Sequence, residues 1–548
     1  MNNFSGLHRK TINTKLSSEE FDLLVIGGGI TGAGIALDAS SRGMKVALIE
    51  KNDFASGTSS KSTKLIHGGL RYLKQFDFWL VKEVGSERAI VHNIAPHLVI
   101  PEKMVLPLIK NGTYNSWLTS IGLKIYDILA SVEGDDKRKM LTKEEAYKIE
   151  PLLPKDILEG AGYYAEYRTD DARLTIEVLK TALNYDTTVL NYCKAVGFIY
   201  IEEKVRGAKV IDEFTGNKFN IKAKYVINAT GPWVDNLRQI NKSKTGKRLH
   251  LTKGVHLVFP REKLPVKQAI YFDIPDGRMM FAIPRGKTTY VGTTDTNYQN
   301  NKDNVEVNTV DALYLISAVN NMFPSINLSL NDVQSSWAGL RPLIHEEGKS
   351  ASELSRKDEI FVSESELISI AGGKLTGYRK MAERIVDLIC KKYEKRYDKE
   401  FKEIKTQSIV LTGGKFKNFK EVVAYQNEIF EKLKTFGFIK VDTDYLVHSY
   451  GKQTDIILKK FDELNDIDSE IRLAKSELWF CINFEMVQTP MDFFIRRTGK
   501  LYFDVESMKI LKDSILKEFS TVFNWNNKVL AHHEDELDKV IFNSTNFK

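Results

Sequence analysis

Three hydrophobic patterns succeed one another along the 548-residue chain. Residues 21–26 form a short apolar run, residues 30–39 repeat apolar side chains with a helical period, and residues 46–49 are again apolar. Residues 251–298 instead alternate apolar and polar side chains, as strands of an antiparallel sheet do. Residues 417–548 return to the helical period. These patterns predict an α/β part, an antiparallel sheet and a C-terminal α-helical domain.

The first predicted strand, turn and helix carry the most informative motif. Gly27, Gly29 and Gly32 have the G-x-G-x-x-G spacing after the first apolar run, and Glu50 ends the second run about twenty residues later. The glycines permit a tight turn, close approach of a pyrophosphate and close packing of helix on strand. The helix N-terminus attracts the diphosphate, and Glu50 suits a ribose without a 2′-phosphate. The motif predicts a Rossmann-type dinucleotide site.

Two later strands are expected to reach the same ligand. One runs into Thr230-Gly231, and another, at residues 367–370, enters Gly373 and an amphipathic helix. Lys374 lies at the start of that helix, where a cation is unfavourable unless an anion binds there. A cofactor that contacts both an early Rossmann turn and a late glycine-lined helix tip must be long, which favours FAD over NAD.

A polar loop and a glycine pair follow the Rossmann unit. Gly, Ser and Thr dominate residues 56–63, which predicts a loop that wraps a ligand with hydroxyls and backbone N–H groups. His67, Gly68, Gly69 and Arg71 come next, and the paired glycines allow close approach of a flat ligand. His67 could instead be an ordinary satisfied histidine, and Arg71 a surface charge.

The candidate substrate site combines cations with histidines. The cations are Arg71, Arg285, Arg341 and Lys374. Such a set suits a small dianion, for example a phosphate monoester, and Arg341 between apolar neighbours needs an anion partner. Oxidation of a secondary alcohol requires removal of its hydroxyl proton, for which histidine is suited near neutral pH. His67 and His256 are both candidates, and the residues do not choose between them.

The element order predicts a discontinuous domain organisation. The expected domains are FAD-binding (20–75, 155–245 and 350–395), substrate-binding (76–154 and 246–349) and C-terminal α-helical (400–548). Residues 115–130 place apolar side chains on one helical face, which fits a core helix or a helix on a membrane surface. Arg496 and Arg497 are expected to have a packing or surface role rather than to make a functional contact.

Composition excludes several classes of protein. A hydrophobic fraction of 42% with 28% charged residues is ordinary for a globular protein, and the net charge of +7 is compatible with anionic substrates or an anionic membrane. Three widely spaced cysteines predict neither disulfides nor a metal site and favour a reducing cytosol. No basic stripe indicates nucleic acid, and neither a signal peptide nor a transmembrane segment is expected.

On these residues the chain resembles the FAD-dependent aerobic, quinone-linked glycerol-3-phosphate dehydrogenases, closest to their Gram-positive-type members. The motifs are DLLVIGGGITGAGIALDA, SGTSSKSTKLIHGGLRYLKQFD, EYRTDDARLTIE, VINATGPWVD, TKGVHLVF, DGRMMFAIPRGKTTYVGTTDT, SSWAGLRPLIHEEGK, AGGKLTGYRKMAE and DFFIRRTGKLYFD. The resemblance implies oxidation of sn-glycerol 3-phosphate to dihydroxyacetone phosphate, with electrons passing through noncovalent FAD to a membrane quinone. It also implies a cytoplasmic enzyme held peripherally on the inner face of the cell membrane, with a homodimer as one expected assembly.

The resemblance also distributes roles among residues. Arg71, Tyr72 and Lys374 would hold the phosphate, Arg341 and His256 would lie near the reacting carbon and hydroxyl, and His67 beside the flavin. The expected FAD contacts are Gly27, Gly29, Ile30, Thr31, Gly32, Glu50, Lys51, Thr58, Ser59, Ser60, Ser62, Leu65, His67, Gly68, Gly69, Ala229, Thr230, Gly231, Trp233, Gly339, Gly373, Lys374, Leu375 and Thr376.

Three other functions stay open on the sequence. An oxidase of the same family would pass electrons to oxygen and release peroxide. A flavin-binding protein could use FAD only as a structural support in a membrane assembly, although the clustered cations argue against it. An FAD amine or amino-acid oxidase would prefer a carboxylate substrate.

Overall fold

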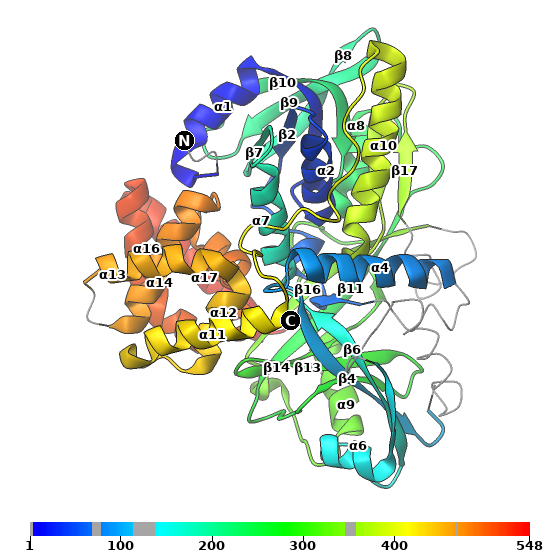
Figure 1. The fold of residues 1–548 in the computed structure, drawn as a ribbon, viewed down its shortest axis with the longest axis vertical. Helices are drawn as coiled ribbons and strands as arrows, with labels where there is room; N and C mark the ends of the chain where they lie inside the picture. The colour runs from blue at the N-terminus through cyan, green and yellow to red at the C-terminus, as the bar shows by residue number, and fades with distance from the viewer. Residues whose placement is uncertain (1–3, 68–77, 113–136, 346–357, 466–467) are drawn as a thin grey trace.

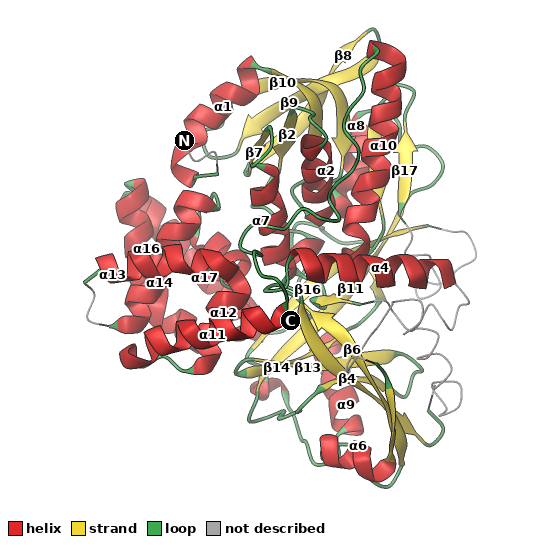
Figure 2. Cartoon of the chain, viewed as in Figure 1, coloured by secondary structure: helices red, strands yellow, loops and turns green. Residues whose placement is uncertain are grey.

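Two β-sheets and a flanking helical domain make up the computed structural model shown in Figures 1 and 2. The structure describes residues 4–67, 78–112, 137–345, 358–465 and 468–548. None of the helices in those ranges is both long and apolar enough to cross a membrane. The predicted combination of an α/β part, an antiparallel-sheet part and a helical C-terminal part is confirmed.

The first sheet is mainly parallel and holds the Rossmann unit. Its order is β17 (Glu359–Val362), β18 (Ile368–Ala371), β10 (Lys218–Asn228), β1 (Glu20–Ile26), β2 (Val46–Ile49) and β7 (Thr187–Leu190), with β8 (Cys193–Ile201) and β9 (Lys204–Asp212) attached through β10. β1 pairs in parallel with β2 and β10, and β10 with β18, so their carboxyl ends meet at one edge. The continuous apolar runs are explained by this burial on both faces.

Helices cover the first sheet. The long helix α2 (Ile30–Ser41) packs against both α7 (Asp171–Ala182) and α10 (Tyr378–Tyr397), as Figure 1 shows. The shorter α1 (Arg9–Ser18) contacts β7 and β10, and α8 (Val234–Ile240) contacts β18. Nearly every residue of α2 is buried, because helices lie on both of its sides.

The second sheet is mostly antiparallel, as the alternating pattern predicts. Its order is β15 (Thr296–Asn297), β11 (Leu249–Pro260), β14 (Thr288–Gly292), β13 (Met279–Arg285), β12 (Ala269–Asp273), β4 (Ile100–Ile109), β6 (Leu158–Arg168) and β3 (Leu65–Ile66), with β16 (Ser335–Ile344) on β11 and β5 (Lys139–Thr142) on β6. The pair β12 and β4 is parallel. The associated helices are α4 (Phe78–Ile94), α6 (Lys143–Ile149) and α9 (Thr309–Met322).

The last part of the chain is helical and lies against one flank of both sheets (Figure 1). Its helices are α11 (Phe419–Leu433), α12 (Lys440–Tyr450), α13 (Thr454–Glu463), α14 (Ser469–Phe484), α15 (Lys500–Phe503), α16 (Val505–Phe523) and α17 (Asn527–Thr545). Their apolar core continues into the second sheet through residues such as Tyr290 and Trp337. The helical domain therefore shares a core with the sheet it flanks.

The domain boundary expected at residue 155 is displaced in the structure. β6 pairs along its length with β4 of the second sheet, and β3 pairs with β6. The chain returns to the first sheet only at α7, which begins at Asp171. Pairing between distant strands decides this boundary, and the local pattern around residue 155 contains no sign of it.

Two helix starts follow from local sequence: the Thr-x-x-Glu spacing of residues 142–145 predicts a capping box, and Asp170 before a helical pattern predicts an N-cap. Thr142 and Glu145 form a capping box, and the Asp170 side chain accepts a hydrogen bond from the backbone N–H of Arg173. The helix expected to begin at Lys374 starts later, because a 3-10 turn precedes α10 at Tyr378. Residues 115–130, expected to be helical, lie outside the described residues.

Buried ion pairs join the helical domain to the Rossmann part. Arg173 of α7 donates from Nη1 and Nη2 to the Glu485 carboxylate at 2.6 and 2.8 Å, and Lys180 donates to Glu485 at 2.9 Å. All three are buried, and the charges of Arg173 and Lys180 hold the pKa of Glu485 well below its usual range although burial alone would raise it.

A second buried junction involves the Arg496-Arg497 pair. Arg496 and Arg497 both donate to the carboxylate of Asp53, at 2.6 to 3.0 Å. Asp53 is fully buried, which would raise its pKa, but the two guanidinium groups hold that pKa at about 2. Of the two roles expected for Arg496 and Arg497, packing or surface, the structure shows packing.

Replacement of Arg173 tests the first junction. Arg173→Met leaves the buried Glu485 carboxylate with too little compensating charge, so we expect the free energy of unfolding to fall by about 3–5 kcal/mol. Arg396→Met removes a partly exposed pair with Glu366 and should cost at most about 1 kcal/mol. Urea unfolding followed by circular dichroism measures both, and equal losses in the two variants would contradict the assignment.

Candidate active site

Two glycines of the first turn, Gly27 and Gly32, leave no space for a side chain. Gly27 has φ +119°, and a Cβ there would lie 2.5 Å from the carbonyl oxygen of Ala229. A Cβ on Gly32 would lie 1.9 Å from the carbonyl oxygen of Gly27. A Cβ on Gly29 would meet nothing closer than the Ser59 hydroxyl, at 3.1 Å, so this position is open toward the ligand side. These contacts match the three glycine roles that the motif predicts.

The helix after the turn presents its N-terminus to the same space. α2 begins at Ile30, whose backbone N–H donates to the Ser59 Oγ at 2.9 Å. The Glu50 carboxylate accepts from the N–H groups of Gly28 and Asn52 at 2.7 and 3.0 Å. Burial raises the pKa of Glu50 even though these hydrogen bonds act in the opposite direction. The backbone of the glycine turn, a serine and an acid therefore line one end of a cleft.

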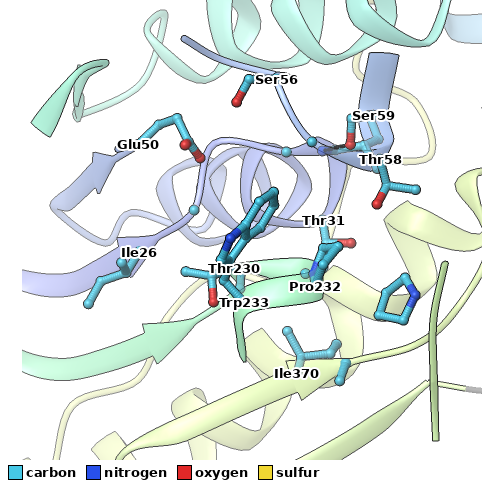
Figure 3. Close-up of a pocket in the computed structure, with 18 of the residues that line it drawn as sticks. Ile26, Thr31, Glu50, Ser56, Thr58, Ser59, Thr230, Pro232, Trp233 and Ile370 are labelled. Carbon is cyan, nitrogen blue, oxygen red and sulfur yellow. Dashed lines mark hydrogen bonds between the residues drawn. The ribbon is translucent and has the colours of Figure 1, made fainter. Parts of the chain in front are cut away.

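This cleft has a volume of about 380 Å³ and follows the carboxyl ends of β1, β10 and β18. The expected cofactor residues that line it are Gly27, Gly29, Ile30, Thr31, Glu50, Lys51, Thr58, Ser59, Ser62, Ala229, Thr230, Gly231, Trp233, Gly373, Lys374 and Leu375. In Figure 3, Glu50 lies at one side of the Rossmann turn, Thr58 and Ser59 at the other, and Trp233 below it. The first glycine turn and the turn at Gly373 therefore line one cavity.

A smaller cavity of about 140 Å³ adjoins the cleft. Thr58, Ser62, Gly373, Lys374 and Leu375 line both cavities. The smaller cavity also contains the expected residues Leu65, His67, His256, Gly339, Arg341 and Thr376. It is lined by strands β3, β11 and β16 of the second sheet and by the loops that contain residues 58–63 and 373–376.

Arg341 is held by the turn after β14. Its Nη1 donates to the Thr294 carbonyl oxygen and the Asp295 carboxylate at 2.9 and 3.0 Å, and its Nη2 donates to the Thr293 hydroxyl at 2.8 Å. Asp295 is thus the anion partner that the apolar surroundings of Arg341 require. Room for the guanidinium depends on Gly254, where a Cβ would lie 2.4 Å from Nη2.

The two candidate histidines have different surroundings. His256 is buried, and its Nε2 lies 3.0 Å from the Thr63 hydroxyl. Burial, together with the charges of Arg341 and Lys64, lowers the pKa of His256 well below its usual range. His67 is half-buried, and its backbone N–H donates to the Thr376 hydroxyl at 3.2 Å.

Some expected residues do not line either cavity. Gly32 and Ser60 are buried beside the cleft. Arg285 faces another cavity of about 720 Å³, between the second sheet and the helical domain, where it donates to Asp170 at 2.8 Å. The structure therefore does not bring Arg285 to the other candidate substrate cations. Arg71, Tyr72, Gly68 and Gly69 lie outside the described residues.

Other cleft residues have no signal in the sequence. Asp303, from the loop between β15 and α9, lines the cleft and is paired with Lys51, whose ammonium lies 4.2 Å from the Trp233 ring centroid. Cys193 and Ala195 line it from the start of β8. These positions depend on pairing and loop packing between distant segments, so no local motif identifies them.

The lining of the cleft fits FAD. A long cavity joins the Rossmann turn to Gly372, which has φ +82°, and continues into the smaller cavity. Gly27, Gly29 and Ile30 would hold the diphosphate, and Glu50 the adenosine ribose. When bound there, FAD supplies two-electron oxidation chemistry at its isoalloxazine ring. Lys374 would place positive charge near that ring.

Comparison with protein families identifies the class. Residues 22–377 match the model described as "FAD dependent oxidoreductase", and residues 404–529 match the "C-terminal domain of alpha-glycerophosphate oxidase". The first match covers more than half of the chain. The chain is therefore an FAD-dependent oxidoreductase.

Individual relatives narrow the assignment. The chain is 48% identical over 541 residues to the aerobic glycerol-3-phosphate dehydrogenase of Bacillus subtilis, covering 98% of each chain, and 48% identical over 540 residues to that of Staphylococcus aureus strain RF122, covering 98% of this chain and 97% of the relative. A crystal structure of the glycerol-3-phosphate dehydrogenase from Bacillus halodurans complexed with FAD has a TM-score of 0.85, with 41% identity over 99% of each chain. The chain belongs to the aerobic glycerol-3-phosphate dehydrogenase family.

The position of Arg341 can be tested without changing Arg341. Gly254→Ala should displace the guanidinium, because the added methyl occupies its place, and should lower kcat/KM by up to about 10²-fold. FAD content, read from the visible absorbance, should stay unchanged. Gly377→Ala is the matched control, since a Cβ there meets nothing within 4 Å. Equal kinetics in both variants would contradict the proposed importance of the Arg341 position.

Proposed function

We propose that the protein oxidises sn-glycerol 3-phosphate to dihydroxyacetone phosphate with noncovalent FAD as the first electron acceptor. The observation that carries this proposal is the small cavity at the end of the cleft, where Arg341, Lys374, His67 and His256 lie together. Cations suit a phosphate monoester, and the histidines suit a reaction that removes a hydroxyl proton. The names of the relatives that match the whole chain support the same substrate.

Roles within the cavity follow from charge and hydrogen bonding. We assign the phosphate to Lys374, with Arg71 and Tyr72 as the further phosphate ligands that the family resemblance implies. Arg341, fixed by Asp295, would lie near the reacting hydroxyl and stabilise the oxygen as its proton leaves. The base is one of the two histidines, His67 or His256.

We further propose that the electrons leave to a membrane quinone from a protein bound peripherally to the cytoplasmic face of the membrane. The net charge of +7 favours association with an anionic lipid surface. An oxidase that passes electrons to oxygen is the second candidate, because the helical domain matches a model named after alpha-glycerophosphate oxidase. A homodimer is part of the same proposal.

The substrate assignment is tested by anaerobic titration. Glycerol 3-phosphate should bleach the yellow protein at one equivalent per flavin, whereas glycerol should not, because it lacks the dianion that the cations bind. Bleaching by an amino acid instead would support an amino-acid oxidase. Absence of bleaching by each of these compounds would favour a structural role for FAD and contradict the proposal.

Arg341→Met should reduce turnover by at least about 10²-fold while FAD content stays near that of the parent protein. The reason is that Arg341 lies in the smaller cavity and does not line the larger cleft. Arg396→Met, which changes an exposed arginine far along α10, serves as the control. Unchanged turnover in Arg341→Met would refute the role of this cation.

The acceptor is decided by two assays on the same preparation. With a soluble quinone analogue under argon, a dehydrogenase should turn over at its full rate. In air without quinone it should release little peroxide. Peroxide formed in proportion to the oxidised glycerol 3-phosphate would instead establish the oxidase.

A further inference from the structure

The loop from Ser60 to Lys64 is held firmly against helix α7 and the second sheet. The backbone N–H and hydroxyl of Ser62 donate to Asp171 at 3.0 and 2.7 Å. The Trp337 indole N–H donates to the Ser62 carbonyl oxygen at 3.2 Å, and the Tyr290 hydroxyl donates to the Thr63 carbonyl oxygen at 3.1 Å. The Thr63 side chain is half-buried and lines the smaller cavity. Its hydroxyl therefore stands at a fixed place in the candidate active site.

His256 is equally well fixed. Its ring stacks on that of Trp337, with a distance of 4.7 Å between the ring centroids and an angle of 12° between the ring planes. Only 1% of the surface of His256 is exposed. The opposite strand makes room for the ring with Gly292, where a Cβ would lie 2.2 Å from Cδ2. The ring therefore cannot rotate freely, and its Nε2 stays directed at Thr63.

The surroundings of the His256 ring decide which nitrogen carries the proton. Nδ1 is buried and has no hydrogen-bond partner among the described residues. A proton on Nδ1 would be a buried hydrogen-bond donor without an acceptor, which costs about 1–3 kcal/mol of folding free energy. In folded proteins, buried N–H groups without a partner are also rarer than buried acceptors without one. The lowered pKa leaves the ring a single proton near neutral pH. That proton belongs on Nε2, which donates it to the Thr63 hydroxyl oxygen.

This protonation state of His256 determines what the Thr63 hydroxyl can donate to. Because Thr63 accepts from His256, its own hydroxyl hydrogen is left to donate elsewhere, and the hydrogen bonds of the described residues give it no other acceptor. Thr63 lines the smaller cavity, and its loop neighbours Thr58 and Ser62 line both this cavity and the FAD cleft. The Thr63 hydroxyl therefore has a hydrogen to donate to a ligand that occupies the smaller cavity.

We propose that Thr63, oriented by His256, donates a hydrogen bond to a carbonyl oxygen of the bound flavin ring and makes the flavin easier to reduce. The reason is that reduction adds negative charge to the ring, and a donor to a ring carbonyl stabilises that charge. His256 is then a positioning residue, and of the two candidate bases it is His67 that remains to take the substrate proton. The proposal rests on the FAD site and is independent of the identity of the substrate.

The first test compares Thr63→Val with Thr63→Ser. Valine has the shape of threonine without the hydroxyl, so reduction should become less favourable by about tenfold, which corresponds to a fall of about 30 mV in the two-electron midpoint potential. Serine keeps the hydroxyl and should keep the potential. A redox dye and a chemical reductant measure the potential without any substrate, so failure of the substrate assignment would not affect the result. An unchanged potential in Thr63→Val would overturn the proposal.

The second test establishes that His256 acts through Thr63. His256→Phe keeps the stack on Trp337 but removes the Nε2 proton, so it should lower the potential less than Thr63→Val does. In the double variant the potential should match that of Thr63→Val alone, because His256 then has no hydroxyl to orient. Fully additive shifts would contradict the proposed coupling.

A third measurement applies even if the Thr63→Val protein does not fold. Nitrogen-15 NMR of the FAD-loaded protein labelled at histidine distinguishes a protonated ring nitrogen from an unprotonated one, and the signals lost in His256→Phe identify the residue. We expect a protonated Nε2 and an unprotonated Nδ1 near neutral pH. A proton on Nδ1 would overturn the proposal, since Thr63 would then donate to His256 and not into the cavity.

Discussion

The site depends on backbone segments that pack without side chains between them. Gly32 packs against the carbonyl oxygen of Gly27, and Gly27 packs against that of Ala229. These contacts bring the first turn of α2 and the end of β10 to the same edge of the parallel sheet. Because parallel strands present their carboxyl ends together, the turn at Gly373 reaches this edge as well. The result is one continuous cleft. A long cofactor bound in it could extend from Glu50, the acid expected to bind the ribose, to the smaller cavity.

In the second sheet, glycines likewise leave space for the side chains of the candidate site. Gly254 leaves the space that the Arg341 guanidinium fills, and Gly292 leaves the space for the His256 ring. Both glycines lie in strands, where they cost conformational entropy and contribute no packing of their own. That cost is offset because each glycine leaves room for a polar side chain, Arg341 or His256, whose position is then fixed by its neighbours. The shape of the smaller cavity therefore depends on Gly254 and Gly292 as much as on Arg341 and His256.

The sequence predicted best where the signal is local. The Rossmann turn, the cap at Asp170 and the alternating strands around His256 all follow from spacing within a few residues, and the structure contains them. The same spacing could not reveal that β6 belongs to the second sheet, because this depends on pairing with β4 about 60 residues away. Nor could it reveal that Arg285 turns toward Asp170, or that Asp303 reaches the cleft. Thr63 was included in a hydroxyl-rich loop, but its pairing with His256 needed the fold.

The link between Asp53 and the Arg496-Arg497 pair has a consequence for how the protein is made. These residues are 443 and 444 positions apart, and Asp53 begins the loop that leads into the cleft. On a ribosome, the N-terminal strands emerge long before the arginines that complete the loop are synthesised. The cofactor loop can therefore reach its final form only after Arg496 and Arg497 have been synthesised. Stable capture of the cofactor would then require a polypeptide that extends past Arg497, because shorter translation products lack this junction.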